Sequence, residues 1–530
     1  MRMTHWLDKR AMLTPDRIAL MDGDGATVTF RELRKQARRT AKRLARRGLG
    51  TGGMAAVLCG NGLHVPPLLH AVHYLRAVYL PLNVRLAPAE IRHQLLDAGC
   101  RLLICDDAHA GLAEAVRGLL PDIQIVRTDE LLDAGPPEAG ARAGGPDDAG
   151  SAAAAGADRD PAGPGDDDVQ LADVCEIDLE AVSTVMYTSG TTGRPKGVIH
   201  TFGNHWASAV GSALNLGLSE RDRWLVALPL FHVGGLSALM KNVIYGMPVV
   251  IHERFDPARA NRAVFGQGVT IVSAVAQMLV RMLDGLGEAR YPETLRCVLL
   301  GGGPAPRALL EACRDKGVPV FQTYGLTETA SQAATLAPEY ALAKLGSAGK
   351  PLFQTELKIV LADGREAPPG AAGEIAVRGP NVTPGYWNNP AATAEAIRDG
   401  WLHTGDIGYV DEEGFLYVLD RRSDLIISGG ENVYPAEIEA VLAAHPAVAE
   451  AGVAGVPDER WGKVPVAFVR PKPGARLTEE DVKRHCAERL ARYKQPVRVH
   501  FVAELPRNAA GKLVRKDLLR LLDGLSSSKD

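Results

Sequence analysis

The sequence carries almost no net charge and has no long apolar run. Its 530 residues include 60 Lys and Arg against 63 Asp and Glu, for a formal charge of −3 and an isoelectric point near 6.6. This balance gives no general electrostatic case for nucleic acid or an anionic membrane as a partner. The longest apolar stretch, 268–280, is interrupted by Ser273 and Gln277. Because crossing a bilayer takes about 20 apolar residues, we predict a protein without stable membrane insertion.

Cysteine pairs and a secretory leader are also missing. The seven cysteines are odd in number and contain no C-x-x-C pair, so they predict reduced thiols rather than a disulfide or zinc framework. The first ten residues lack the apolar core of a signal peptide. These features predict a cytoplasmic protein, and they leave both a monomer and a homo-oligomer open.

A basic segment at 31–48 raises the question of nucleic-acid binding again. It holds nine Lys and Arg residues, but Leu33, Ala37, Ala41 and Leu44 recur at helical spacing, which leaves the charges on the opposite face. An amphipathic helix with a solvated face is the better interpretation. We therefore predict no nucleic-acid partner.

The chain does contain enough apolar material for several cores. Hydrophobic residues make up 46% of it, and at about 150 residues per unit its length predicts three to four structural units. Near the N-terminus, apolar runs at 54–58 and 101–105 alternate with helical patterns such as the one at 65–75. This alternation predicts an α/β fold with a largely parallel sheet.

Changes in composition divide the rest of the chain. Residues 134–168 are rich in Gly, Ala, Pro and Asp and have almost no large apolar side chain, which predicts a disordered insertion. Short strands with frequent turns predict a small β-rich subdomain over 346–420. The pattern past Arg421 predicts a compact α+β domain of about 100 residues. We expect a large N-terminal domain, 1–422, and a smaller mobile C-terminal domain, 423–530.

The stretch 188–197 indicates phosphate binding. It follows the apolar, β-branched run 181–187 and supplies three glycines, four hydroxyl side chains and Lys196. In such a loop, backbone N–H groups and hydroxyls donate hydrogen bonds to phosphates, and an ammonium adds a point charge. The loop is not the P-loop of the NTPases, because Pro195 precedes the lysine and Gly197 follows it. The alternative is a Ser/Gly-rich surface linker.

This loop resembles the signature loop of the adenylate-forming enzymes, which include acyl-CoA synthetases, peptide-synthetase adenylation domains and firefly-type luciferases. Further motifs continue the resemblance in the family's order: Leu228–His232, Gly301–Pro306, Gln322–Glu328, Thr404–Asp406, Asp420–Arg421 and Pro506–Lys512. Most of these motifs are weak alone, and their common order gives them weight. The resemblance covers nearly the whole chain outside 134–168. It implies an AMP-forming acyl-CoA synthetase that uses ATP, CoA and Mg²⁺.

The resemblance also implies how ATP is bound. The glycine turn packs along the adenine, Tyr324 stacks on it, and Asp406 accepts hydrogen bonds from the ribose hydroxyls. The ATP- and AMP-binding residues implied in this way are Thr188, Ser189, Gly190, Thr191, Thr192, Lys196, Gly302, Gly303, Gln322, Thr323, Tyr324, Asp406 and Arg421.

By the same resemblance, Lys512, His232 and Thr327 are the catalytic residues. Lys512 bridges the substrate carboxylate and the α-phosphate, Thr327 hydrogen-bonds that phosphate, and His232 lines the acyl site. Glu328 supplies the hard oxygen ligand that Mg²⁺ prefers. A lone His is more often a core residue, so His232 is assigned by its place in the motif order.

The second half-reaction implies a further set of residues. Gly429 and Gly430 fall in the loop that swings in for thioester formation, and we expect them to contact CoA. Ser423 falls at the family's hinge between the large and small domains, where Asp or Lys is common. We therefore assign the hinge position to Ser423 but draw no conclusion about the charge at the hinge.

Four stretches resemble one branch of the synthetases, whose aromatic acid carries two carboxylates: 203–206, 213–218, 323–332 and 344–350. One carboxylate is activated, so the other is held as an anion in the acyl pocket. If 203–215 is helical, His205, Ser208 and Ser212 share one face and form a polar stripe for that anion. Ser331 is a second candidate. The alternative is that these are small helix-packing residues.

Other functions are compatible with the same motifs. They are an acyl-CoA ligase for another aromatic or aliphatic acid, an adenylating enzyme that loads a carrier protein in trans, and a luciferase-like monooxygenase. Because 18 residues follow Lys512, we expect no fused carrier domain. A catalytically inactive relative is disfavoured, because Lys196, Glu328, Asp406 and Lys512 are all present.

Overall fold

The structure is a computed structural model, and it describes most of the chain. The described residues are 1–132, 171–172, 174–188, 195–303, 305–421, 426–428, 431–433, 435–458, 461–490, 492–508 and 511–526. The predicted disordered insertion at 134–168 lies outside them. Across the described ranges, no helix is long and apolar enough to cross a membrane. The chain divides into two compact units, and each is described by itself.

The first unit comprises residues 1–210, 217–270 and 383–390 and contains a six-stranded sheet. Its strands follow the order β10 (Lys196–Thr201), β9 (Val182–Thr188), β5 (Val78–Pro81), β4 (Met54–Leu58), β6 (Leu102–Cys105) and β7 (Gln124–Arg127). Neighbouring strands are parallel except for β9 with β10. The largely parallel α/β sheet predicted from the alternating pattern is confirmed.

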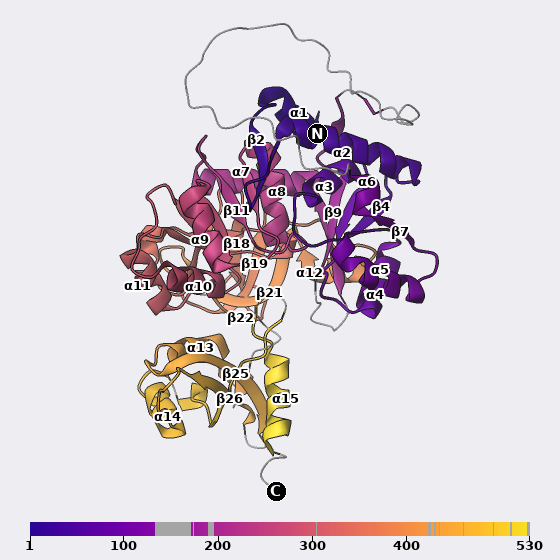
Figure 1. Cartoon of the computed structure of the whole chain (residues 1–530). Helices are drawn as coiled ribbons and strands as arrows, with labels where there is room; N and C mark the ends of the chain where they lie inside the picture. The colour runs from indigo at the N-terminus through magenta and orange to yellow at the C-terminus, as the bar shows by residue number, and fades with distance from the viewer. Residues whose placement is uncertain are drawn as a thin grey trace. The chain divides into compact units, whose positions relative to one another are not determined.

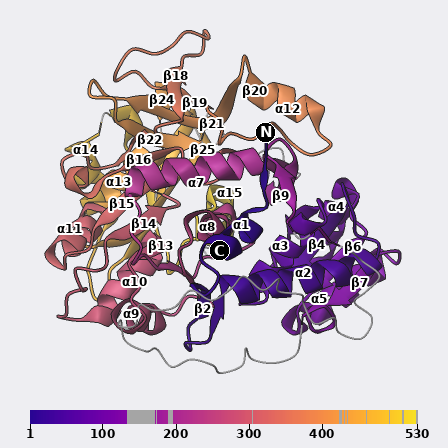
Figure 2. The same ribbon diagram turned by 90° about the horizontal axis from the view of Figure 1, so that it is seen from above.

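Helices surround this sheet (Figure 2). They are α2 (Phe30–Arg46), α3 (Val65–Tyr74), α4 (Pro88–Ala98) and α5 (Ala110–Leu119). Leu95 of α4 and Val116 of α5 join strand residues such as Leu58 in one buried core. Every residue of α3 is buried, as expected for a helix enclosed by protein on all sides.

Helix α2 accounts for the basic segment. Its fully buried residues include the four predicted from helical spacing, Leu33, Ala37, Ala41 and Leu44. The hydroxyl of Thr29 accepts a hydrogen bond from the Glu32 backbone, and the Glu32 carboxylate accepts one from the Thr29 backbone at 2.7 Å. This capping box fixes where the helix begins. The amphipathic interpretation is confirmed, with Arg38 as a buried exception.

The first unit also contains further strands and helices. Strand β1 (Arg2–Thr4) pairs antiparallel with β8 (Glu176–Asp178). A second set of strands has the order β11 (Trp224–Val226), β12 (Val249–Ile251), β2 (Ile18–Asp22) and β3 (Thr27–Thr29). The further helices are α1 (Trp6–Leu13), α6 (Thr128–Leu131), α8 (Val233–Tyr245) and α9 (Pro257–Gly266). Helix α7 (Phe202–Leu216) follows β10 directly, which meets the condition for His205, Ser208 and Ser212 to share one helix face.

The second unit comprises residues 211–216, 271–382 and 391–530. It begins with three parallel strands, β13 (Ile271–Val275), β14 (Cys297–Gly301) and β15 (Val320–Tyr324), connected by α10 (Ala276–Leu286) and α11 (Arg307–Asp315). Antiparallel strands continue in the order β16 (Ala334–Leu336), β17 (Ser347–Pro351), β22 (Leu416–Arg421), β21 (Trp401–Val410), β19 (Gly373–Arg378) and β18 (Glu356–Val360). This run of strands matches the β-rich region predicted over 346–420.

The C-terminal part contains a mixed sheet with helices on both faces (Figure 1). Its strands are β24 (Glu431–Val433), β23 (Ile426–Ser428), β26 (Gly462–Pro471), β25 (Val448–Asp458) and β27 (Arg498–Phe501). Val453 and Ala467 pack with α13 (Pro435–Ala443) and α14 (Glu479–Ala487). The adjacent Ala454 and Phe468 face α15 (Arg515–Ser526), because alternate strand residues point to opposite faces. The predicted boundary between 422 and 423 falls outside the described residues and stays a prediction.

Gly349 in β17 offers a direct test of the close pairing between β16 and β17. Its φ is +85°, and a Cβ added to it would lie 1.9 Å from the Thr335 carbonyl oxygen, so the site has no room for a side chain. Gly364 has the same φ of +85° with nothing within 4 Å of an added Cβ. We expect Gly364→Ala to cost about 1–2 kcal/mol of unfolding free energy from backbone strain alone. Gly349→Ala should cost at least about 2 kcal/mol more, because the clash is with backbone.

Urea denaturation of the two variants beside the wild type measures this difference. Equal midpoints for Gly349→Ala and Gly364→Ala would contradict the close approach of β17 to the Thr335 backbone.

Candidate active site

The stretch predicted to bind phosphate connects two paired antiparallel strands, β9 and β10. Thr188, the last residue of β9, pairs with Lys196, the first residue of β10. The residues predicted to bind phosphate between them, Ser189, Gly190, Thr191 and Thr192, lie outside the described part of the chain. Thr188 and Lys196 therefore fix the two ends of the loop side by side. The strand that follows the loop was not predicted from the sequence.

A segment distant in sequence runs beside β10. The hydroxyl of Thr383 donates to the Ile199 carbonyl at 2.6 Å, and the Trp387 backbone donates to the Gly197 carbonyl at 2.7 Å. Between them, the ring of Tyr386 lies 5.2 Å from the Lys196 ammonium, within the range of a cation–π interaction. Tyr386 was not predicted as a site residue, because its role depends on this pairing.

His232 stands at the start of α8, in a segment held by Asn61. The Asn61 side-chain amide donates to the carbonyls of Leu228 at 2.9 Å and His252 at 3.1 Å. Its oxygen accepts from the Leu230 backbone at 2.9 Å. One buried amide thus satisfies three backbone groups around the turn that leads to His232. Asn61 was not predicted from the sequence, where its only signal is a Gly-Asn-Gly turn after a buried strand.

His205 and Ser208 lie on α7 and are both buried. The Nε2 of His205 is 3.2 Å from the Thr184 hydroxyl, which is 3.1 Å from Nδ1 of His200. Burial, with the neighbouring His200 and His73, lowers the pKa of His205 well below its usual value. His205 is therefore neutral near pH 7, and it can offer an anion a hydrogen bond but not a positive charge.

The second unit brings the predicted nucleoside-binding residues together. The Tyr324 hydroxyl at the end of β15 donates to the Asp406 carboxylate in β21 at 2.8 Å. In the next strand, Arg421 is the backbone partner of Asp406. On the other side, Leu300 of β14 is paired with Gln322 of β15, so both strands end at the same edge. Ligands bind at this carboxyl edge in parallel sheets.

The glycine turn follows β14 at that edge. Gly302 has a φ of +87° and Gly303 of +159°, conformations that a side chain disfavours. The buried Gln322 has an Nε2 with no hydrogen-bond partner among the described residues, so it is available to a ligand. The Thr323 hydroxyl instead donates to the Ala334 carbonyl at 2.9 Å, which commits that side chain to the sheet.

Thr327 and Glu328 lie in a short 3₁₀ turn, Thr327–Thr329, and the residues that follow it have strained backbone. Ala330 and Ser331 follow with φ values of +50° and +112°, which are unfavourable for residues with side chains. Asn381 restrains the turn by donating to the carbonyls of Thr329 and Gln332 at 3.2 and 3.3 Å. Such strain persists where surrounding contacts enforce it, and it is common at functional sites.

Lys512 is exposed at the end of a tight turn in the C-terminal part. Its backbone N–H donates to the Asn508 side chain at 2.9 Å, and its carbonyl accepts from the Asn508 backbone at 2.9 Å. Gly511 has a φ of +76°, which a turn of this kind requires. The predicted hinge residue Ser423 and the predicted CoA contacts Gly429 and Gly430 lie outside the described residues.

Two family descriptions match the chain. The AMP-binding enzyme family matches residues 7–387, and the C-terminal domain of AMP-binding enzymes matches residues 437–512. The first match includes the segments from Asn61 to Tyr386 and the second includes Lys512, whereas Asp406 and Arg421 lie between the two matched ranges.

Named relatives match from end to end. The 2-succinylbenzoate–CoA ligase of Geobacillus kaustophilus strain HTA426 is 56% identical over 520 residues, covering 98% of both chains. A solved o-succinylbenzoate CoA synthetase from Bacillus subtilis, in complex with the acyl-adenylate intermediate, matches with 46% identity and a TM-score of 0.85, covering 98% of each chain. The same enzyme in complex with ATP and magnesium also matches at 46% identity and a TM-score of 0.85, covering 98% of this chain and all of that one.

Proposed function

The chain belongs to the family of AMP-binding enzymes, and we propose that it joins 2-succinylbenzoate to coenzyme A with ATP as co-substrate. The products are 2-succinylbenzoyl-CoA, AMP and diphosphate, and the reaction is a step of menaquinone biosynthesis. The observation that carries the proposal is the end-to-end similarity to a named ligase for this acid. The four stretches that indicated an aromatic acid with two carboxylates resemble the same ligase.

The chemistry proceeds in two displacements. A carboxylate oxygen of the acid attacks the α-phosphorus of ATP, and diphosphate leaves. The CoA sulfur then attacks the acyl carbonyl, and AMP leaves. The acid itself is the first nucleophile, so the protein contributes positioning and charge rather than a covalent intermediate.

We assign the departing phosphates to the loop between Thr188 and Lys196. The pairing of these two residues supports this role, because it closes the loop at its base and puts Lys196 there. Tyr386 orients the lysine through its ring face. Lys512 is the second cation, and we propose that it bridges the substrate carboxylate and the α-phosphate. Thr327 donates a hydrogen bond to that phosphate, and His232 lines the acyl site.

We assign the nucleoside to the edge formed by β14 and β15. Tyr324 stacks on the adenine beside Gly302 and Gly303. Its hydroxyl bond to Asp406 supports this role, since it fixes the orientation of the ring and of a carboxylate that can accept from both ribose hydroxyls. We assign Arg421, the strand partner of Asp406, to the same sugar.

The reaction uses Mg²⁺, and Glu328 is suited to hold it. A carboxylate is the hard oxygen ligand that Mg²⁺ prefers, and here it lies in a turn whose backbone is fixed on both sides. When bound, the ion offsets phosphate charge during diphosphate departure.

We assign the second carboxylate of the acid to His205, Ser208 and Ser331. His205 is neutral, so its contribution is hydrogen bonding, which distinguishes a carboxylate from an apolar group of the same size. An acid without this carboxylate would not form those hydrogen bonds.

The substrates are small molecules, and we propose that the protein acts in the cytoplasm. All seven cysteines are free thiols, which supports a reducing compartment.

We assign Gly429 and Gly430 to CoA binding and Ser423 to the hinge. We propose the domain boundary between residues 422 and 423.

The acid is tested by measuring CoA-thioester formation with 2-succinylbenzoate, benzoate and a fatty acid in parallel. We expect kcat/KM for 2-succinylbenzoate to exceed the others by at least about 10²-fold, because buried polar groups discriminate strongly against acids that cannot pair with them. A preference for benzoate or the fatty acid would reject this acid while leaving the ligase class intact. Adenylate that accumulates without thioester would favour a carrier protein as the acceptor.

Lys512 is tested by separating the half-reactions. Lys512→Ala should lower diphosphate release from ATP and acid by about 10²- to 10³-fold, the usual effect of removing one group that stabilises transition-state charge. Turnover of supplied 2-succinylbenzoyl-adenylate with CoA should be unchanged. Lys516→Ala, an exposed lysine on α15, is the matched control. Normal diphosphate release by Lys512→Ala would remove Lys512 from the first step.

A further inference from the structure

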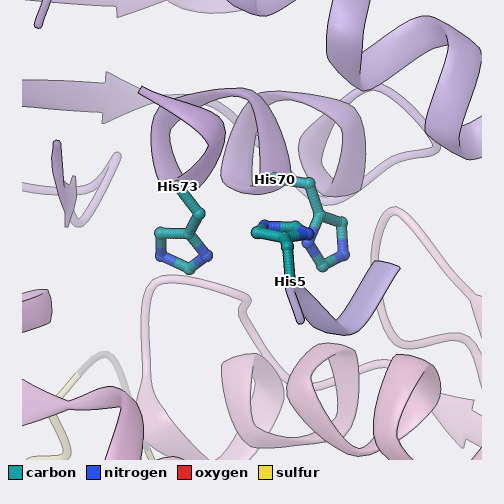
Figure 3. A group of neighbouring side chains, drawn as sticks. All are labelled: His5, His70 and His73. Atoms are coloured by element: carbon teal, nitrogen blue, oxygen red, sulfur yellow. The ribbon is translucent and has the colours of Figure 1, made fainter. Parts of the chain in front are cut away.

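Three buried histidines meet in the first unit, and one of them, His73, neighbours the assigned residue His205. His70 and His73 lie one helical turn apart on α3, and His5 directly precedes α1. Figure 3 shows the three side chains converging from these two segments. The ring centroids of His5 and His70 are 5.8 Å apart, and those of His70 and His73 are 6.4 Å apart. One ring nitrogen from each residue lies within 4.8 Å of the others.

Two of these rings carry buried nitrogens that need a partner. The Nδ1 atoms of His5 and His70 are buried and have no hydrogen-bond partner among the described residues. Buried polar atoms without partners are rare in folded proteins, and each one calls for an explanation such as a bound ion. Packing of neutral rings against one another would leave both atoms unsatisfied.

His73 is already arranged as metal-binding histidines usually are. Its Nε2 lies 3.3 Å from the Ser183 carbonyl and 3.0 Å from the Ser183 hydroxyl. A carbonyl can only accept, so Nε2 carries the proton and the lone pair remains on Nδ1. Donation of the second ring N–H to a backbone carbonyl is typical of histidines that bind metal ions.

We propose that His5, His70 and His73 form a binding site for Zn²⁺. Three imidazoles are a known zinc ligand set, with the fourth position left to water, and the Zn–N distance of about 2.0–2.1 Å puts the nitrogens about 3.4 Å apart. In the structure the nitrogens lie within 4.8 Å of one another, so binding requires the rings to shift closer together. The ion would tie the N-terminal segment to α3, in addition to the hydrogen bond from the Tyr74 hydroxyl to Asp8.

The surroundings keep the ligands neutral and set the strength of binding. Burial lowers the pKa of His73 to about 4, so its ring is in the form that binds metals. Asp8 is the nearby carboxylate, and it accepts from Arg34 at 2.7 Å and Tyr74 at 2.7 Å, with Arg38 3.7 Å away. The positive charges of Arg34 and Arg38 thus outnumber the negative charge of Asp8, which disfavours a cation nearby. We therefore expect zinc to bind more weakly here than at a site with thiolate ligands.

A second group complicates a simple zinc titration. Ligand atoms of Cys59, His64 and Asp106 also lie within 4.8 Å of one another. His109 and the Gly60 backbone already donate to Asp106, and burial raises the pKa of the Cys59 thiol. Cys59→Ser removes the thiol from this group and leaves the three histidines untouched, which makes it the background for the test.

The test is calorimetric titration of the metal-free, full-length Cys59→Ser protein with zinc chloride, without a polyhistidine tag. We expect one ion per chain and a thermal midpoint that rises with zinc. Adding His70→Gln, or separately His5→Gln, should abolish both effects while the circular dichroism spectrum stays unchanged. Absence of binding in Cys59→Ser, or equal binding after either His substitution, would overturn the proposal.

Cobalt gives a readout that does not depend on the His variants folding. With Co²⁺, the Cys59→Ser protein should show the visible absorption of a cobalt ion in a low-symmetry nitrogen site. If the wild type shows only a thiolate charge-transfer band and Cys59→Ser shows no cobalt absorption, the metal site is at Cys59 and the three-histidine proposal is wrong.

Discussion

The repulsion between two anions is the constraint on which the proposed site depends. A carboxylate must approach a triphosphate closely enough to bond with its α-phosphorus, and each negative oxygen it meets opposes this approach. Lys196, Lys512 and Mg²⁺ on Glu328 are the compensating charges in our account. Lys196 lies in a hairpin whose strands pair at Thr188 and Lys196. Lys512 follows Gly511, whose positive φ shapes a C-terminal turn, and Glu328 lies in a 3₁₀ turn followed by two strained residues.

Local patterns were sufficient to predict several elements of the first unit. The apolar run at 54–58 is β4, and the helical spacing of Leu33 to Leu44 is α2. In each case the pattern and the burial agree, because one face or a whole strand lies in a core. The motif order likewise indicated a family that the matches confirm.

Long-range contacts explain why other features could not be predicted from the sequence. Strand β10 was not predicted, because its residues 196–201 are stabilised as a strand by pairing with β9 and with the segment around Tyr386. Asn61 acts on a carbonyl 167 residues away, and no local spacing reveals such a contact. His5 is also distant in the chain from His70 and His73, so the three-histidine cluster emerges only from the fold.

The most direct measurement is exchange of radiolabelled diphosphate into ATP in the absence of CoA. If the carboxylate attacks the α-phosphorus, the first step is complete and reversible without the thiol, so label should enter ATP when 2-succinylbenzoate is present and not when it is omitted. Label that enters ATP only after CoA is added, or formation of ADP and phosphate instead of AMP and diphosphate, would contradict an acyl-adenylate mechanism.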